Sequence, residues 1–449
     1  MKKILILGAG QSTAHLIPFL LEQAEKHDWF VAVGDVYQDA AAARVDGHPR
    51  GEAIYFDVND AELRSTHIKE ADLVVNMLPP THQHVVGWDC VANGAHMVSA
   101  SYEDIRMKDL DMDAHRRGIL ILNEMGLDPG IDHMSAMEII VDIRKRGGHV
   151  ESFKSYGCGL PAPDADVNPL RYTITWNPRN IVMAGEWGAT YLVDGKVKML
   201  PSHEVFQRTW PVQVDGIGQM EAYPNRDSLY YRQLFGLNDA HTMIRGTMRY
   251  PGWCETWLQV VRLGLPNETM RIPDVERLAY RDITEMFLPL HTGEGKLEAR
   301  LADYLKINPT GQIMQNLEWL GLFSDDAVPA GAATVSEVMI DLLRRKLELP
   351  PGEKDMIVIM HEIEARFPND GNRGERIAST LVQFGEKGGA TAMSKAVGLP
   401  TGIAATLILN GEIRLTGCQL PTHTTVHTRV LEELKTYGVE FKQSVSEIE

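Results

Sequence analysis

The sequence predicts an α/β protein in which an N-terminal, doubly wound parallel sheet precedes a mixed α/β domain that carries a small helical insert. In the first 125 residues, short apolar runs alternate with amphipathic stretches, the pattern of helices covering both faces of a parallel sheet. After Asn123 the apolar runs are separated by turns rich in Pro, Gly and Asn, which indicates a mixed sheet. A mostly helical pattern then occupies residues 271–345.

The expected strands are short apolar runs bounded by turn residues. Those of the first sheet lie at residues 3–7, 30–33, 71–78, 96–98 and 119–122, and those of the second at 150–156, 172–176, 189–193 and 355–363. Amphipathic periodicity predicts helices from residue 15, at 391–397 and at 430–437. We expect three domains: residues 1–125, residues 126–268 with 350–390, and a helical insert at 269–349. Whether residues 391–449 return to the first domain is left open.

The acidic balance of the chain limits its partners. Its 449 residues carry a formal net charge of −17, which repels phosphate backbones and anionic lipids, so neither nucleic acid nor membrane is expected. No run of 18 apolar residues predicts a membrane span, and glycines interrupt the first apolar stretch too early for a signal peptide. The four cysteines contain no CxxC pair, so we expect no metal site, no disulfides and a cytoplasmic location.

A glycine-rich turn separates the first expected strand from the first expected helix. Gly8 and Gly10 fill two positions of a G-x-G-x-x-G motif, and Thr13 takes the third. The first glycine permits the tight turn, the second lets the backbone approach a pyrophosphate, and a small third residue allows close packing. The sequence therefore predicts a dinucleotide-binding Rossmann domain, with Gly8, Gly10, Gln11, Ser12 and Thr13 around the pyrophosphate. An ordinary glycine turn is the alternative.

Asp35 ends the second expected strand, where a carboxylate accepts hydrogen bonds from the adenosine ribose hydroxyls. Because that carboxylate would repel a 2′-phosphate, Asp35 predicts NAD as the cofactor and disfavours NADP. Asp57 and Val58 follow the third strand and are expected near the adenine. Leu78 and Pro79 end the next strand, on the expected nicotinamide side. A solvated Asp35 and a helix N-cap at Asp57 remain alternatives.

Longer motifs match a known family. Residues 126–133 read GLDPGIDH and are preceded by Asn123-Glu124. Further matching stretches are Ser101-Tyr102 and residues 155–163, 168–170, 223–228, 245–250 and 397–404. Together these motifs resemble those of the glutamate-forming saccharopine dehydrogenases, also called saccharopine reductases. The resemblance extends from the first strand to near the C-terminus.

The resemblance implies a reaction and an architecture. Members of the family condense glutamate with 2-aminoadipate 6-semialdehyde to an imine and reduce it with NAD(P)H to saccharopine, or run in reverse in lysine degradation. They consist of a Rossmann domain, a substrate domain and an inserted helical domain. Fungal members use NADPH, and NADP-using relatives tend to be basic where this chain has Asp35. Fungal members also carry a cysteine directly after a Ser-Tyr pair, whereas here Gly157 separates Tyr156 from Cys158.

A carboxylate-rich substrate requires fixed cations. The candidate substrate-binding residues are Ser101, Asn225, Arg226, Arg245 and Thr247. Arg226 matches a substrate-contacting segment of the family, and its guanidinium can bind a carboxylate through two parallel hydrogen bonds. A structural salt bridge between Arg226 and Asp227 is the alternative. Either Arg245 or Arg249 could bind a further carboxylate, and a structural role for each is equally open.

Proton transfer beside the nicotinamide is assigned to three candidate catalytic residues, Asp128, Tyr102 and Cys158. Asp128 could exchange a proton and stabilise an iminium cation, or simply form the turn before Pro129. Tyr102 could instead be an amphipathic wall residue. The amines and carboxylates of the substrate could also carry these protons themselves, so the sequence does not require a protein base.

We expect an NAD-dependent, homodimeric oxidoreductase that acts on a small, carboxylate-rich amino acid. The nearest enzymatic alternative is a carboxyspermidine-type imine reductase of polyamine metabolism, whose cationic substrate would favour an acidic pocket over Arg226 and Arg245. A non-catalytic NAD-binding regulator is an alternative of another class. Such a regulator would need Gly8, Gly10 and Asp35 but not the arginine motifs.

Overall fold

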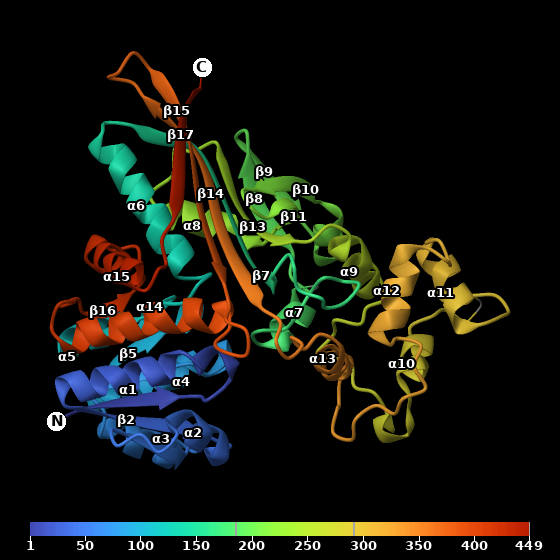
Figure 1. The fold of residues 1–449 in the computed structure, drawn as a ribbon, viewed down its shortest axis with the longest axis horizontal. Coiled ribbons are helices and arrows are strands. Elements are labelled where there is room, and N and C mark those ends of the chain that lie inside the picture. Colours follow the sequence, from blue (N-terminus) through green and yellow to red (C-terminus); the bar gives the residue numbers. More distant parts are fainter. Residues whose placement is uncertain (185, 291, 449) are drawn as a thin grey trace.

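The strands of the protein form two separate sheets. The computed structural model describes residues 1–184, 186–290 and 292–448. Within these residues one sheet has seven strands and the other has ten. Figure 1 shows the seven-stranded sheet at the N-terminal end, the ten-stranded sheet beside it, and a helical segment at the far side. This arrangement confirms the predicted fold class.

The seven-stranded sheet is parallel throughout, in the order β16-β6-β5-β4-β1-β2-β3. Its strands are β1 (Lys2–Leu7), β2 (Trp29–Asp35), β3 (Gly51–Tyr55), β4 (Leu73–Asn76), β5 (His96–Ser99), β6 (Leu120–Leu122) and β16 (Gly417–Gln419). Its helices are α1 (Leu16–His27), α2 (Gln38–Val45), α3 (Ala61–Lys69), α4 (Gln83–Asn93), α5 (Asp111–Arg117) and α14 (Ala392–Leu409). Ile4 and Ile6 of β1 pack with α1, α2 and α14, whereas Leu5 and Leu7 pack with α3, α4 and α5. Both faces are therefore buried, which explains the continuous apolar run.

The ten-stranded sheet is mixed, with the main order β10-β11-β13-β7-β14-β15-β17 and with β8, β9 and β12 beside this path. Its strands are β7 (His149–Pro161), β8 (Ala189–Val193), β9 (Lys196–Leu200), β10 (Trp210–Val214), β11 (Gly218–Pro224), β12 (Arg226–Asp227), β13 (Thr242–Arg249), β14 (Asp355–Phe367), β15 (Arg373–Phe384) and β17 (Lys442–Ile448). The long central strand β7 runs parallel to β13 and antiparallel to β14. α6 (Ile131–Lys145) and α8 (Ser228–Leu234) pack on one face, around Phe153.

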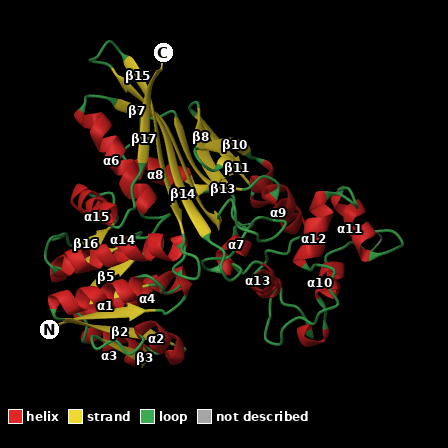
Figure 2. Cartoon of the chain, in the orientation of Figure 1, coloured by secondary structure: helices red, strands yellow, loops and turns green. Residues whose placement is uncertain are grey.

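The helical segment joins the second sheet through a continuous core. It contains α10 (Tyr280–Met286), α11 (Leu297–Leu305), α12 (Gln312–Leu320) and α13 (Val335–Lys346), and it follows α9 (Trp253–Arg262). Figure 2 shows helices and loops without strands in this region. Leu301, Leu317 and Met339 share one buried cluster with Trp257 and Tyr172. The predicted strand at 172–176 forms only an isolated bridge from Ile174 to Glu348, because its side chains enter this core from a loop.

The last part of the chain contributes to both sheets. α14 packs on α1, β16 pairs with β6, and α15 (Thr424–Thr436) packs on α6 before β17 pairs with β15. α14 is long and apolar enough to cross a membrane by length and composition, and 83% of it is buried inside the protein. Its apolar character therefore reflects a position between the layers. The three-domain division made from the sequence stays a proposal.

Candidate active site

The glycine turn lies where β1 ends. Gly8 has a φ of +100°, which a residue with a side chain rarely adopts, and its N–H donates to the Gly34 carbonyl at 2.8 Å. Gly10 has a φ of −73°, and a Cβ added there would meet no protein atom within 4 Å. A 3-10 helix, η1 (Gln11–Thr13), follows before α1 begins. The hydroxyl of buried Thr13 donates to the Gly10 carbonyl at 2.8 Å. The space in front of Gly10 is therefore open, as a pyrophosphate would require.

Asp35 braces this turn through its side chain. One carboxylate oxygen accepts the Ala9 N–H at 2.8 Å, and the other accepts the Tyr37 N–H at 2.9 Å. Each oxygen is thus already engaged by a backbone amide that shapes the chain around Gly8. These two hydrogen bonds give Asp35 a structural role that does not depend on a bound ribose.

The other predicted cofactor residues have different surroundings. Asp57 accepts the Asn59 N–H at 2.9 Å in a turn, while Val58 is buried in the apolar layer below the sheet. Leu78 lies beside the glycine turn, since its Cδ2 would be 3.6 Å from a Cβ at Gly8. Pro79 follows and is exposed. Leu78 and Pro79 thus flank the Gly8 turn.

A buried glutamine connects the cofactor side with the second motif. Gln83, at the start of α4, donates through its amide nitrogen to the Leu78 carbonyl at 2.9 Å and to the Ser101 hydroxyl at 3.2 Å. Tyr102 follows Ser101, and its hydroxyl donates to a carboxylate oxygen of Asp128 at 3.3 Å. A continuous series of contacts therefore leads from the glycine turn to Asp128.

Asp128 stands in the loop between β6 and α6, above the second sheet. The guanidinium of Arg245 bridges two carboxylates, at 2.5 Å from Asp128 and 2.9 Å from Asp132. A Cβ at Gly157 of β7 would lie 2.7 Å from the second oxygen of Asp128, so the missing side chain makes room for this carboxylate. The Asp128 side chain remains 21% exposed, whereas the Asp132 side chain is only 2% exposed. Asp128 is therefore the accessible member of the pair.

The surroundings of Asp128 and Tyr102 favour their neutral forms. Burial, and then the neighbouring carboxylate of Asp132, raises the pKa of Asp128, although Arg245 opposes the change. Burial, and then the carboxylate of Asp128, raises the pKa of the Tyr102 phenol. A carboxyl group whose pKa is raised can hold or release a proton nearer neutral pH. Asp128 thus has the geometry and the electrostatics of a proton-exchanging group.

Arg226 is a cation with no carboxylate partner in the described part of the chain. Among the residues that the structure describes, none places a carboxylate within ion-pair distance of its guanidinium. The guanidinium lies 3.9 Å from the centroid of the Trp187 ring and 4.8 Å from that of Tyr102. Asp227, the alternative partner considered above, instead accepts the Leu229 N–H and caps α8. Two aromatic rings therefore orient Arg226 and leave its hydrogen-bond donors available.

The two arginines of β13 differ in their partners. Arg245 is paired with Asp128 and Asp132, so its charge is compensated inside the protein. Arg249 is 5% exposed and lies among the rings of Trp253, Tyr172 and Tyr223, at 4.9, 5.0 and 5.7 Å from their centroids. In the described part of the chain no carboxylate forms an ion pair with Arg249, and its Nε has no hydrogen-bond partner. Arg249 is thus as buried as Arg245 but lacks the carboxylate partners that Arg245 has.

The remaining predicted residues lie on both faces of the second sheet. Thr247 is beside Gly157 in the neighbouring strand, and the Asn225 N–H donates to the Arg245 carbonyl at 2.9 Å. Cys158 follows Gly157 and therefore points to the opposite face from Asp128. Burial raises the pKa of its thiol to about 12, which disfavours the reactive thiolate. The structure does not bring Cys158 to Asp128.

Sequence reasoning did not single out several residues of the site. Trp187 and Gln83 occupy no motif, so no local signal could have indicated that they contact Arg226 and Ser101. Glu124 and His133 stand inside the GLDPGIDH region, but without an assigned role. Their motif position was the one available signal.

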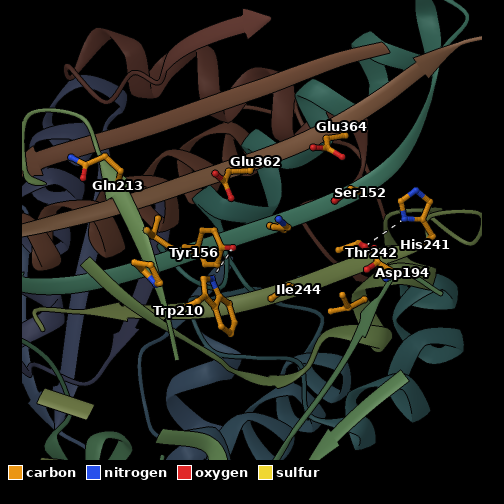
Figure 3. Close-up of a pocket in the computed structure, with 14 residues that line it drawn as sticks. Ser152, Tyr156, Asp194, Trp210, Gln213, His241, Thr242, Ile244, Glu362 and Glu364 are labelled. Atoms are coloured by element: carbon orange, nitrogen blue, oxygen red, sulfur yellow. Dashed lines mark hydrogen bonds between the residues drawn. The ribbon is translucent and has the colours of Figure 1, made fainter. Parts of the chain in front are cut away.

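A separate hollow of about 480 Å³ lies on the other face of the ten-stranded sheet. Figure 3 shows Ser152, Tyr156, Glu362 and Glu364 around it. Because side chains alternate along β7, these residues face away from Gly157 and Asp128. This hollow therefore does not belong to the candidate active site.

Two family models match the chain over nearly its whole length. The model described as the saccharopine dehydrogenase NADP binding domain matches residues 4–122. The model described as the saccharopine dehydrogenase C-terminal domain matches residues 126–439. The junction between the matches lies at the start of the loop that carries Asp128.

Named relatives and one solved structure agree with these matches. Bovine mitochondrial alpha-aminoadipic semialdehyde synthase is 32% identical over 98% of this chain, which spans only 47% of that protein. Saccharopine dehydrogenase [NADP(+), L-glutamate-forming] of Schizosaccharomyces pombe is 30% identical over 99% of both chains. Apo saccharopine dehydrogenase (L-Glu forming) of Saccharomyces cerevisiae is 28% identical, with a TM-score of 0.87 over 99% of this chain and 100% of that one.

The comparisons correct the predicted cofactor preference. The fungal relatives are named as NADP(+) enzymes, and the matching N-terminal model describes an NADP binding domain. The prediction of NAD from Asp35 is therefore wrong. Asp35 also accepts hydrogen bonds from the amides of Ala9 and Tyr37, which gives it a structural role in the turn, so its presence alone does not indicate NAD. The cytoplasmic location and the homodimer stay predictions.

Proposed function

The chain belongs to the saccharopine dehydrogenase family, and from this membership we propose that it interconverts saccharopine with L-glutamate and 2-aminoadipate 6-semialdehyde, using NADP(H). The reaction would transfer a hydride at a C–N bond, in lysine metabolism. Relatives of about the same length carry this activity in their names. The observation that carries the proposal is Arg226, a guanidinium beside two aromatic rings with no carboxylate partner among the described residues, near the partly exposed carboxyl of Asp128.

Arginines would hold the substrate carboxylates. A guanidinium forms two parallel hydrogen bonds with a carboxylate, and such charged bonds are stronger than neutral ones. Arg226 and Arg249 are arginines without a carboxylate partner among the described residues, whereas Arg245 is already paired with Asp128 and Asp132. An acidic protein of net charge −17 needs such local cations to attract a ligand with several carboxylates.

The cofactor fits the turn between β1 and α1. The open space at Gly10, the backbone amides of η1 and the adjacent Leu78 support a pyrophosphate there and a nicotinamide toward Ser101. When bound, a nicotinamide supplies hydride acceptance or donation. No second function is favoured, since a cationic polyamine-type substrate would be repelled by Arg226 and Arg249.

Asp128 would handle the protons of this chemistry. Oxidation of the secondary amine breaks its C–H bond and yields an iminium, to which water adds before the C–N bond breaks. Addition of water releases a proton and departure of glutamate as an amine takes one up. Asp128 can accept and return that proton, and its anionic form can stabilise the iminium. Tyr102 orients the carboxylate by donating a hydrogen bond to it.

An assay with purified protein tests the proposal. NADPH oxidation would be followed with glutamate plus 2-aminoadipate 6-semialdehyde, and separately with a diamine plus aspartate semialdehyde. We expect activity only with the first mixture, and NADP⁺ reduction with saccharopine. Activity only with the second mixture would identify a polyamine-type enzyme, and binding of NADPH without any turnover would identify a regulator.

A further inference from the structure

A group of buried ionisable side chains lies directly behind Asp128. Glu124 and His133 are each 1% exposed and Asp132 is 2% exposed. They stand in the loop after β6 and in the first turn of α6. The reaction proposed above uses none of them, yet ionisable groups are rarely buried so completely without a partner or a function.

His133 stands between two carboxylates. Its Nδ1 is 3.1 Å from a carboxylate oxygen of Glu124, and its Nε2 is 3.3 Å from one of Asp132. Neither contact has the alignment of a hydrogen bond, so the link between these groups is mainly their charge. The same oxygen of Asp132 contacts Arg245, which in turn contacts Asp128. Two residues, Asp132 and Arg245, therefore link His133 to the carboxyl group that faces the site.

A positive charge on His133 would offset part of the negative charge of this group. The group holds three carboxylates, those of Glu124, Asp128 and Asp132, and one guanidinium, that of Arg245, which pairs with Asp128 and Asp132 while Glu124 contacts His133. Uncompensated buried charge is costly, and a protonated imidazole supplies a second positive charge at the centre of the group. One carboxylate still exceeds the two cations. Asp128 is the most exposed of the three carboxyl groups, so a proton from solvent reaches it most readily.

Other elements that face His133 add no free charge. The rings of Tyr231 and Phe235 on α8 lie 4.7 and 5.5 Å from the His133 ring. His361 of β14 contacts the Ser135 hydroxyl at 2.8 Å, and burial lowers the pKa of His361 to about 3, so it is neutral.

Beyond Glu124 the next ionisable group is Glu103. Its backbone N–H donates to Glu124 at 3.1 Å, and its carboxylate lies 3.9 Å from Lys108. Glu103 thus has a cation of its own. The charge balance at Asp128 depends mainly on Glu124, Asp132, His133 and Arg245.

We propose that His133 is a positioning residue whose positive charge, held between Glu124 and Asp132, sets the proton occupancy of Asp128 and hence the pH range of catalysis. This inference rests on the proposed function. Its physical direction is fixed: a nearby positive charge favours the carboxylate form of Asp128, and a nearby negative charge favours the protonated form. Removing the positive charge must therefore raise the pKa of Asp128, and removing a negative charge must lower it.

Four variants test the inference. The acid limb of kcat/KM for saccharopine oxidation, where Asp128 must lose its proton, should move up by about 1 pH unit in His133→Gln. In Glu124→Gln it should move down by a similar amount, and in the double variant it should return close to its original position. His361→Gln is the matched control, because it removes an equally buried but uncharged imidazole, and its acid limb should not move.

A second readout separates this inference from the proposed function. The ¹³C resonance of the Asp128 carboxyl, assigned by its loss in Asp128→Asn, can be titrated in the unliganded protein without any activity. The same opposite shifts should appear there even if saccharopine is not the substrate. Three results would overturn the inference: shifts in the same direction in both single variants, no shift in either of them, or a shift in His361→Gln as large as that in His133→Gln. If His133→Gln does not fold, Glu124→Gln alone decides, because an unmoved or upward-moved titration would contradict the charge relation.

Discussion

Two aromatic side chains contact the guanidinium of Arg226. The rings of Trp187 and Tyr102 lie beside it, and the nearest acidic residue along the chain, Asp227, caps α8 instead of pairing with it. A charged side chain kept in this state has its hydrogen-bond donors free for a ligand. The contrast with Arg245, which two carboxylates neutralise, separates a binding arginine from a structural one.

Replacement of Arg226 tests this distinction. A hydrogen bond to a charged group contributes about 1.5–3 kcal/mol, so Arg226→Ala should lower kcat/KM for saccharopine by roughly 10- to 150-fold. Arg226→Lys should recover only part of the loss, because an ammonium restores the charge but not the paired hydrogen bonds. Steady-state kinetics with NADP⁺ measure the effect. Arg281→Ala, which removes an exposed arginine paired with Asp325, is the control and should leave kcat/KM unchanged. Near-normal saccharopine kinetics in Arg226→Ala would show that the substrate binds elsewhere.

Asp128 can be tested by a change that keeps its shape. Asp128→Asn removes the charge and the exchangeable proton but still accepts a hydrogen bond from Tyr102, while Arg245 keeps Asp132 as a partner. We expect kcat to fall about 100-fold, the usual scale for a positioned acid–base group, with little change in the urea midpoint. A kcat near that of the unchanged enzyme would leave proton transfer to the substrate or to water.

At the scale of elements, two glycines show the difference between a binding turn and a packing contact. A Cβ added to Gly10 would meet no protein atom within 4 Å, whereas one added to Gly398 of α14 would lie 2.8 Å from the Leu16 backbone nitrogen of α1. Gly398 therefore permits the close approach of α14 to α1. Gly10 faces the space that a pyrophosphate would occupy.

The two alanine variants should consequently have opposite phenotypes. Gly10→Ala should keep the urea midpoint and weaken NADPH binding by about tenfold or more, measured by fluorescence titration. Gly398→Ala should lower the free energy of unfolding by about 1–3 kcal/mol, since added atoms strain a tightly packed contact. Unchanged NADPH affinity in Gly10→Ala would place the cofactor away from this turn.

Element boundaries depended on contacts that the sequence does not display. The pattern at 391–397 extends to Leu409 as α14, because the buried position between α1 and the second sheet stabilises a helix that contains Pro400. The apolar residues at 172–176 instead fill a loop that faces the helical segment, since a short apolar run fits either a strand or a core loop.

For the molecule as a whole, buried neutral histidines link stability to pH. Burial lowers the pKa of His427 on α15 to about 4 and that of His361 to about 3. In the unfolded chain these imidazoles titrate near 6.5, so below that pH the unfolded state binds protons that the folded state refuses. Stability should therefore be full above pH 6.5 and fall as the pH decreases toward about 4.

The variant His427→Gln isolates one of these contributions. Each such histidine steepens the pH dependence of the unfolding free energy by at most about 1.4 kcal/mol per pH unit. Urea denaturation between pH 7 and pH 5 should show a shallower slope in His427→Gln than in the unchanged protein. His203→Gln, at an exposed position, should keep the original slope. Identical slopes in all three proteins would mean that His427 is not held neutral in the folded state.

The sequence by itself determined the features that are local in the chain. The parallel sheet follows from apolar runs alternating with helices, and the turn at Gly8 and Gly10 follows from the backbone conformations and close approach that only glycine allows. The family resemblance rests on motifs that are likewise contiguous, and the matches to both family models confirm it.

Only the tertiary structure decided what each charged side chain does. Arg226, Arg245 and Arg249 belong to neighbouring motifs, yet one lies beside two aromatic rings, one bridges Asp128 and Asp132, and one is buried without an ion-pair partner among the described residues. Asp35 similarly binds the backbone amide of Ala9, a residue of the preceding turn that the sequence could not place beside it. The physical reason is that the role of a charge depends on burial and on partners within a few ångströms, and those partners come from segments far apart in the sequence.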